Sequence, residues 1–186
     1  MPPRVKITKD DIIKGSLELV RAKGAQALNA RTVAAALMCS TQPIFSNFAS
    51  MAELSDAVKL GAYEVYATFL QKEADCGRYP RYKSFGMAYI RFAKEERELF
   101  KLLFMCDRTG EDIRPTPDFS ESVRLIASAN GISMEKAELM HLDMWSCVHG
   151  IGVMLATSFL ELDEKLISGM LTDIYQGLCA RHKSED

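Results

Sequence analysis

The stretch "STQPIFSNFASMAEL", residues 40–54, has the pattern of a short helix followed by the start of a longer one. Ser40 can cap the short helix, and Phe45 and Phe48 give that helix an apolar side. Ser50 and Glu53 have the spacing of a capping box at the start of the longer helix. The outer side of the short helix then holds only small polar groups: Thr41, Gln42, Ser46 and Asn47. What such a helix could bind depends on the rest of the chain.

The composition is that of a compact soluble protein of one or two small domains. The chain has 186 residues, 48% of them hydrophobic and 26% charged. "MPPRVKITKDD" at the N-terminus lacks the apolar core of a signal peptide. The longest uncharged run, residues 144–160, is shorter than the roughly 18 apolar residues of a membrane span, which favours a buried helix. We therefore expect a cytoplasmic protein.

Five cysteines are spread along the chain, with no CxxC pair and no zinc-binding spacing. They are Cys39, Cys76, Cys106, Cys147 and Cys179. This pattern predicts free thiols in a reducing compartment, and a redox-sensing cysteine is the alternative.

The charge is distributed unevenly. Residues 1–50 hold seven basic and three acidic groups, a net charge of +4, and the remainder carries −6. A basic N-terminal segment on an acidic body is typical of a protein with an anionic partner such as nucleic acid. The alternative is an ordinary solvated surface.

The apolar residues recur at the three-and-four spacing of amphipathic helices throughout, and no stretch alternates for long enough to form a strand. We predict an all-α fold of about nine helices. Besides the opening stretch, the expected ranges are 9–23, 30–37, 51–75, 81–94, 95–106, 118–129, 133–159 and 163–181. The Gly- and Pro-rich segment at 107–118 is predicted to be the longest loop.

The second and third expected helices are about three residues apart, which is the spacing of a helix-turn-helix. In that motif the second helix lies in the major groove of DNA and presents its first residues to base edges. Gln42 could pair bidentately with adenine, and the methyl group of Thr41 could touch a thymine methyl. Pro43 fits the first turn of that helix, where a missing N–H loses no intrahelical bond. The alternative is an ordinary helical hairpin with a polar outer face.

The chain from residue 8 to 60 resembles the DNA-binding region of TetR-family transcriptional regulators. That family's pattern runs Ile-x-x-Ala-Ala-Leu, Gly, Leu-Thr-x-x-x-Ile-Ala, a valine-serine turn, and Leu-Tyr-x-x-Phe-x-Ser-Lys-x-x-Leu. The matching positions here are Ile12, Leu17, Gly24, Leu28, Val33, Ala34, Ser40, Ile44, Phe48, Ser50 and Leu54. The resemblance implies a helix-turn-helix domain over residues 1–49 and an effector-binding and dimerisation domain over residues 50–186.

The DNA-binding residues expected on this basis are Arg31, Thr41, Gln42, Pro43, Ser46 and Asn47. Phe45 stands where the family usually has tyrosine, and Met51 where it usually has lysine, so two contacts to DNA phosphates are missing. Ser46, Asn47, Arg31 and Lys6 remain as candidate phosphate contacts. Gly15 and Ser16 replace helix-favouring alanines, which should weaken the first helix by roughly 1 kcal/mol.

Trp145, His149 and Gly150 in "MWSCVHG" are similar to a Trp-x-x-x-His-Gly motif of some ligand-binding domains in that family. The resemblance implies a homodimer formed through the last two helices. Gly150 and Gly152 would each cost about 1 kcal/mol inside a helix unless close packing compensates. The dimer-interface candidates are therefore Gly150, Gly152 and Val153, and a close crossing within the monomer is the alternative.

Aromatic side chains along the middle helices are candidates for a small-molecule pocket, since such sites are apolar with a few polar tips. The candidates are Tyr63, Tyr66, Phe92, Phe104, Met105, Trp145 and His149. Few charged residues fall among them, so we expect an apolar or aromatic effector. The alternative for each of them is an ordinary place in the core.

Other classes of function find little support in the sequence. His141 and His149 lie eight residues apart with no carboxylate or cysteine partner at helical spacing, so we expect no metal site and no cofactor. There is no phosphate-binding glycine loop, no nucleophile elbow and no HExxH, and we expect no enzyme and no catalytic residue. The function expected is a ligand-responsive regulator, a repressor, that binds a palindromic operator as a homodimer and is released by its effector. The alternatives are a dimeric small-molecule-binding protein with weakened or lost operator binding, and a small all-helical enzyme.

Overall fold

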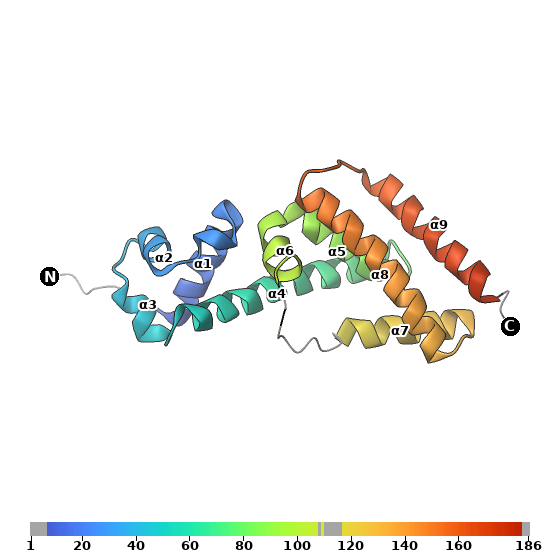
Figure 1. Cartoon of the computed structure of the whole chain (residues 1–186), viewed down its shortest axis with the longest axis horizontal. Coiled ribbons are helices and arrows are strands. Elements are labelled where there is room, and N and C mark those ends of the chain that lie inside the picture. The colour runs from blue at the N-terminus through green and yellow to red at the C-terminus, as the bar shows by residue number, and fades with distance from the viewer. Residues whose placement is uncertain (1–6, 108, 110–116, 184–186) are drawn as a thin grey trace. The chain divides into compact units, whose positions relative to one another are not determined.

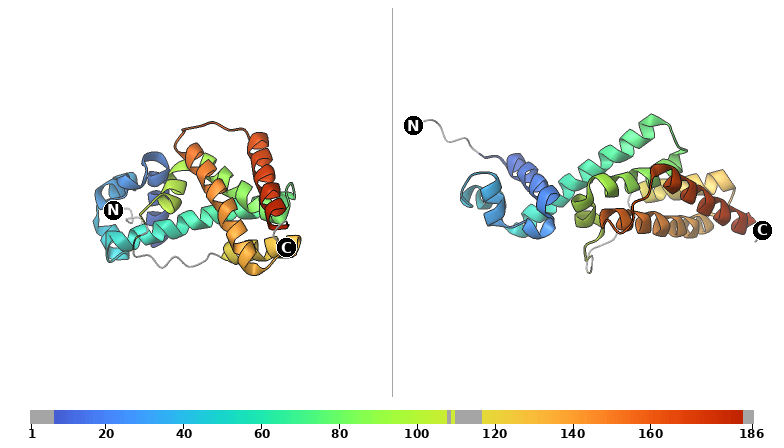
Figure 2. Two further views of the ribbon diagram at one scale, coloured as in Figure 1. Left: turned by 45° about the vertical axis from the view of Figure 1, so that its right-hand side comes forward. Right: turned by 90° about the horizontal axis from the view of Figure 1, so that it is seen from above.

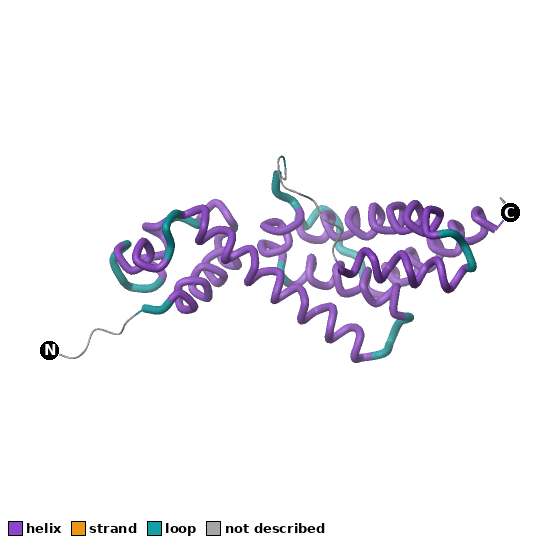
Figure 3. The backbone as a smooth tube through the Cα atoms, turned by 90° about the horizontal axis from the view of Figure 1, so that it is seen from below, coloured by secondary structure: helices purple, strands orange, loops and turns teal. Residues whose placement is uncertain are grey.

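The computed structural model describes residues 7–107, 109 and 117–183. Within these ranges all regular structure is helical, with nine α-helices, one short 3-10 turn at Ala25–Ala27 and no strand (Figure 3). The predicted all-α fold class is therefore confirmed. Most of the predicted loop at 107–118 lies outside the described residues, as do Arg4 and Lys6.

The nine helices lie within about three residues of their predicted bounds, which is close to the usual uncertainty at helix ends. They are α1 Lys9–Lys23, α2 Ala30–Ala36, α3 Gln42–Asn47, α4 Met51–Cys76, α5 Arg81–Glu95, α6 Arg97–Phe104, α7 Pro117–Asn130, α8 Met134–Ala156 and α9 Glu164–Lys183 (Figure 1).

Local capping explains where the first two helices begin. The Thr8 hydroxyl accepts from the amide of Asp11 at 3.2 Å, and the Asp11 carboxylate accepts from the amide of Thr8 at 2.9 Å. Asn29 caps α2 by accepting from the amide of Thr32 at 3.1 Å. Gly24 ends α1 with φ at +78°, in the left-handed region that a glycine tolerates best.

Two caps differ from the sequence prediction. Thr41, not Ser40, is the N-cap residue of α3, and its side chain makes no capping hydrogen bond. Pro43 is the second residue of α3, in the first turn as expected, where a missing N–H breaks no intrahelical bond. At the start of α4, Ser50 accepts from the amide of Glu53 at 3.2 Å as expected, but the Glu53 carboxylate accepts from the amide of Ala49 at 2.7 Å.

The chain divides into two compact units. Unit 1 comprises Met1–Ala67 and Glu96–Cys106, and unit 2 comprises Thr68–Glu95 and Asp107–Asp186. Helix α4 contributes residues to both units, and α6 belongs with the N-terminal helices. These units divide the chain at places other than the boundary expected between residues 49 and 50, and the assignment of roles to domains stays a prediction.

Unit 1 is built around α1, which contacts α2, α3 and α6. Its fully buried side chains include Ile12, Val20, Val33, Ile44, Leu54, Val58, Leu99 and Phe100. The guanidinium of Arg21 at the end of α1 binds both carboxylate oxygens of Glu96, just before α6, at 2.8 and 3.0 Å. Apolar packing and one bidentate ion pair thus hold α6 against α1.

Unit 2 has α8 at its centre, in contact with α5, α7 and α9 (Figures 1 and 2). The buried side of α8 comprises Ala137, Met140, Met144, Val148, Ile151 and Leu155. By length and composition alone α8 could cross a membrane. The same length and composition are typical of the central helix of a helical bundle, and that is the place α8 occupies in this unit.

A charged group is buried among the helices of unit 2. Glu73, near the end of α4, is 1% exposed, and its Oε2 atom lies 2.7 Å from Nη1 of Arg91 on α5. The Nη2 atom of Arg91 donates to Glu164 at the start of α9 at 3.2 Å. Arg91 thus connects α4, α5 and α9 within unit 2.

Candidate functional site

Helix α3 turns its apolar residues toward α1 and its polar residues outward. Ile44 is fully buried and Phe48 is 2% exposed. Gln42, Phe45 and Ser46 are exposed, whereas Thr41, Pro43 and Asn47 are half-buried. The prediction that Phe45 belongs to the apolar side is wrong for this residue: its ring is 53% exposed and lies with Gln42 and Ser46 on the outer side, while Ile44 takes its place in the core.

Two of the polar candidates on α3 are bound to their own helix. The Ser46 hydroxyl donates to the carbonyl of Gln42 at 2.9 Å, and the Asn47 amide donates to the carbonyl of Pro43 at 2.8 Å. Such bonds from serine and asparagine to the preceding turn are common in helices. The side chains of Thr41 and Gln42 make no hydrogen bond within the described part of the chain. Gln42 is thus the exposed residue of α3 whose donors and acceptor are all available.

The N-terminal basic groups differ in what they bind. Lys9 pairs with Glu53 at 3.1 Å and lies 4.7 Å from the ring centre of Phe48. Hydrogen bonding to Glu96 raises the pKa of the Arg21 guanidinium, and the same bonds tie up its charge in contacts within unit 1. The basic residues of α1 and α2 that make no ion pair within the described ranges are Lys14, Lys23 and Arg31. Arg31, the predicted phosphate contact, is exposed in the first turn of α2.

The sequence of α2 and α3 and of the residues that flank them, 19–52, contains no acidic residue, whereas Arg21, Lys23 and Arg31 fall within it. Exposed apolar groups accompany this charge. Phe45 is 53% exposed, and Met38, in the turn after α2, is 95% exposed with φ at +51°. The expected end of the second helix at residue 37 places Met38 in a turn, but the exposure of its side chain was not predicted.

The candidates for an effector pocket fall in both units. In unit 1, the rings of Tyr63 and Tyr66 meet the ring of Phe104 edge-on, with centroids 6.1 and 5.5 Å apart. Met105, directly after α6, is 40% exposed. These residues form an aromatic cluster with two phenolic groups.

In unit 2, His149 lies between two aromatic residues. Its Nδ1 is 2.8 Å from the hydroxyl of Tyr89, and the ring of Trp145 stacks on its imidazole at 5.0 Å and 10°. Burial lowers the pKa of His149, so the imidazole is neutral at pH 7 and Nδ1 can accept from Tyr89. Phe92 is fully buried and meets the ring of Phe69 edge-on at 5.4 Å.

His141, the other histidine of α8, also contacts a tyrosine hydroxyl. His141 Nδ1 is 3.0 Å from the hydroxyl of Tyr82, and burial raises the pKa of that phenol. Both histidines therefore pair with tyrosines of α5. Within the described ranges no three His, Cys, Asp or Glu side chains are placed to hold a metal ion, and all five cysteines are free thiols.

The three candidates for a dimer interface differ in accessibility. A Cβ atom added to Gly150 would meet nothing within 4 Å, Val153 is half-buried, and Gly152 is buried within unit 2. Gly152 therefore supports packing inside the chain, in line with the alternative of a close crossing within the monomer.

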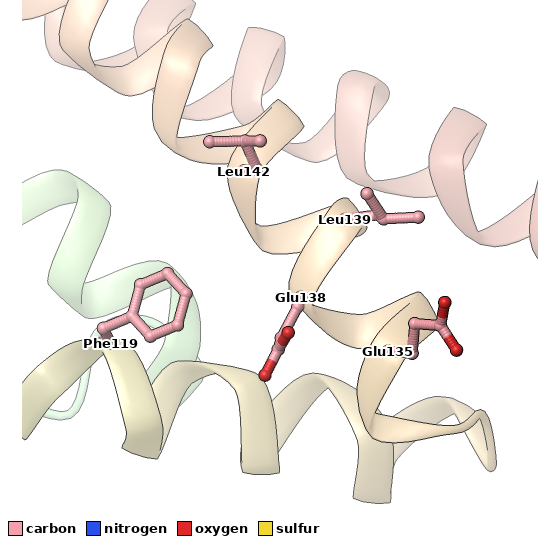
Figure 4. Close-up of a pocket in the computed structure, with 5 residues that line it drawn as sticks. All are labelled: Phe119, Glu135, Glu138, Leu139 and Leu142. Carbon is pink, nitrogen blue, oxygen red and sulfur yellow. The ribbon is translucent and has the colours of Figure 1, made fainter. Parts of the chain in front are cut away.

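A further side of α8 exposes large apolar residues, of which the sequence analysis named only Trp145, and that as a pocket candidate. Leu139 is 57% exposed, Leu142 54% and Trp145 44%, and Leu166 on α9 is 50% exposed. Leu139 and Leu142 line an open groove of about 280 Å³ together with Phe119, Glu135 and Glu138 (Figure 4). The three-residue spacing of Leu139, Leu142 and Trp145, separate from the buried side, is the signal that could have identified this stripe.

A comparison of the sequence with protein-family models and with curated proteins finds no match. The resemblance described above therefore rests on the motif residues themselves. Of these, Ile12, Val33, Ile44 and Phe48 are buried in unit 1. They account for the packing of α1, α2 and α3.

Proposed function

We propose that the chain is a TetR-like, DNA-binding transcriptional regulator. In this proposal α2 and α3 form a helix-turn-helix, and α3 enters the major groove of the operator. The observation that carries it is the outer side of α3, where the Gln42 side chain is exposed and makes no hydrogen bond within the described part of the chain. On the opposite side, Ile44 and Phe48 are buried and pack the helix against α1.

The chemistry of this surface suits a polyanion. No carboxylate occurs in the sequence between Glu18 and Glu53, and Arg31 is exposed without an ion pair within the described ranges. Gln42 has the donor and acceptor that adenine requires for a bidentate contact, and the methyl of Thr41 suits thymine. The Ser46 hydroxyl and one N–H of Asn47 are used within α3, so their acceptor oxygens and the second N–H of Asn47 are left for water-mediated contacts.

The remaining helices would form the sensor and the dimer interface, with residues 1–49 as the DNA-binding domain and residues 50–186 as the other. The exposed stripe of Leu139, Leu142 and Trp145 supports a homodimer, because monomers rarely leave such a row of large apolar side chains uncovered. The aromatic clusters around Phe104 and His149 support an apolar or aromatic effector that releases the repressor from its operator.

Selection of bound duplexes from a random pool tests the DNA-binding proposal. We expect an inverted repeat whose half-sites are about 34–36 Å apart, or a multiple of that distance. Gln42→Ala should cost about 1–3 kcal/mol at one base position of each half-site and relax the preference there. Gln71→Ala, an exposed glutamine of α4, is the matched control. Recovery of no inverted repeat, or an unchanged preference in Gln42→Ala, contradicts the proposal.

A second function is favoured by Phe45 and Met51, which replace the usual tyrosine and lysine. It is a dimeric small-molecule-binding protein that has lost its operator. Binding to a DNA fragment from upstream of the protein's own gene distinguishes the two functions, because operator binding weakens steeply as salt increases. An effector that binds the dimer when no such DNA binding is measured favours the second function.

A further inference from the structure

Phe45 is the unexplained residue on the outer side of α3. Its ring is 53% exposed, and no ring contact or cation–π contact accounts for it within the described part of the chain. A buried phenylalanine side chain gains roughly 1.5–3 kcal/mol relative to an exposed one, so the exposed position carries a cost unless a partner covers the ring.

The surroundings of Phe45 indicate what kind of partner that is. Gln42 precedes it by three residues and is exposed on the same side of α3, and Ser46 follows it. The nearest charged residues along the chain are Arg31 and Glu53, so the ring lies in a stretch without any charge and with hydrogen-bonding groups beside it. A partner that covers this surface therefore offers both hydrogen-bonding edges and small apolar groups.

The major groove of DNA offers both. Its apolar group is the C5-methyl of thymine, which phenylalanine contacts directly. Three residues of an α-helix advance by about 4.5 Å, and successive base pairs are about 3.4 Å apart. Phe45 therefore faces the base pair that neighbours the one read by Gln42.

We propose that Phe45 is a specificity residue that reads a thymine methyl in each half-site, adjacent to the base pair contacted by Gln42. This inference rests on the proposed DNA-binding function and gives Phe45 a role in base recognition in place of a phosphate contact. It specifies a chemical group on the DNA, so removal of that group alone tests it.

The test replaces each thymine of the selected operator, one at a time, by deoxyuridine, which lacks only the 5-methyl group. One such replacement per half-site should weaken binding by about fourfold, the effect expected for burial of one methyl-sized group, and replacement in both half-sites by about 16-fold. A thymine that the methyl of Thr41 contacts can also respond to the replacement, but that effect should persist in Phe45→Ala. All remaining replacements should leave the affinity within about twofold.

Three variants show whether Phe45 is responsible. Phe45→Ala should bind the thymine and deoxyuridine duplexes equally well, whereas Phe45→Tyr, which keeps the ring, should retain the preference. Leu60→Ala, which removes another exposed apolar side chain of unit 1, should behave like the wild type. Circular dichroism of each variant shows whether it is folded, and a purely structural Phe45 would lower thermal stability without changing the ratio of the two affinities.

The experiment distinguishes a wrong role for Phe45 from a wrong assignment of DNA binding to the chain. If the selected operator is bound but no deoxyuridine replacement weakens binding, or if the preference persists in Phe45→Ala, the role of Phe45 is refuted and the DNA-binding function stands. If no specific duplex is recovered at all, both are refuted.

Discussion

Ser16 lies in the middle of α1 with no exposed surface, and its hydroxyl has no hydrogen-bond partner within the described residues. An unpaired buried hydroxyl costs about 1–3 kcal/mol, and serine is also a weaker helix former than alanine. Ser16→Ala should therefore raise the free energy of unfolding by about 1–2 kcal/mol, measured as an increase in the urea midpoint at unchanged slope.

Ser84 on α5 is the matched control for this prediction. It is also buried, but its hydroxyl donates to the carbonyl of Arg81 at 2.6 Å. Ser84→Ala should leave stability unchanged or lower it by up to about 1 kcal/mol. A loss of stability in Ser16→Ala would contradict the argument, because it would mean that the hydroxyl is satisfied in solution.

Met51, the first residue of α4, is half-buried. It occupies the position at which the TetR family, which the chain resembles, usually has lysine. If this position faces a DNA phosphate, Met51→Lys adds one contact in each subunit. The slope of log affinity against log salt should then steepen by about 0.9 per contact, or roughly 1.8 for a dimer. Ala52→Lys, one position further along α4, controls for added charge. Equal slopes in the wild type and Met51→Lys would show that the side chain at position 51 points into the protein.

At the scale of single helices, the sequence predicted nearly every element because the relevant signals are local. Thr8 with Asp11 and Asn29 with Thr32 act within one turn, and the apolar period needs only neighbouring residues. Gly15, which replaces a helix-favouring residue, has a reason that no local signal contains. A Cβ atom there would lie 2.6 Å from Cδ2 of Leu37, the residue that ends α2, so the Leu37 side chain would have to shift.

The details of the candidate site were harder to predict because they depend on partners distant in sequence or on a choice between competing bonds. Lys9 and Arg21 are bound to Glu53 and Glu96, 44 and 75 residues away, so they contribute less free positive charge than the composition suggests. Ser46 and Asn47 are of residue types that can read DNA, yet the Ser46 hydroxyl and one N–H of Asn47 donate to carbonyls of α3. Local propensity cannot distinguish these outcomes, since both arrangements satisfy the same groups.

The contact of Arg91 with Glu73 is the charged link between helices of unit 2 that should matter most for stability. Glu73 is almost fully buried, and its Oε2 makes no hydrogen bond of good geometry within the described residues, so the ion pair at 2.7 Å offsets its desolvation. Arg91→Met leaves that carboxylate buried without a cation. Removal of one partner of a buried pair typically costs about 3–5 kcal/mol, and we expect a loss of this size in urea unfolding.

Arg78 provides the comparison, because it binds the same oxygen of Glu164 as Arg91 does but is 53% exposed. Arg78→Met should cost no more than about 1 kcal/mol, as is usual for an exposed ion pair. Similar losses in Arg78→Met and Arg91→Met would mean that the burial of Glu73 is not what makes the interaction strong.

For the whole molecule, the exposed stripe on α8 predicts self-association. Leu142 is 54% exposed beside the groove that Leu139 and Phe119 line. Leu142→Glu should place a carboxylate in the proposed interface and convert the dimer to a monomer at micromolar concentration, measured by analytical ultracentrifugation. Leu60→Glu, a similarly exposed position in unit 1, should remain dimeric. A dimer that survives Leu142→Glu with unchanged affinity would exclude this stripe as the interface.

The proposed regulation by an effector requires that the aromatic residues and the proposed DNA-binding surface be coupled, and α4 is a covalent path between them. Its first residues follow α3, Tyr63 and Tyr66 contact Phe104 in unit 1, and Phe69 contacts Phe92 in unit 2. An effector that binds one arrangement of the dimer more tightly lowers the affinity for DNA by that difference. Such couplings are typically 1–3 kcal/mol, or about 5–150-fold.

Thermodynamic linkage makes this prediction precise, because bound operator must weaken effector binding by the same factor as effector weakens operator binding. Both affinities are measured by titration calorimetry, with and without the other ligand. Tyr66→Ala should reduce the response to effector and leave DNA binding by the free protein within about twofold. Phe159→Ala, which removes an exposed ring from the loop after α8, should change neither quantity. An effector affinity that is identical with and without bound operator would rule out this mechanism, whatever residues hold the effector.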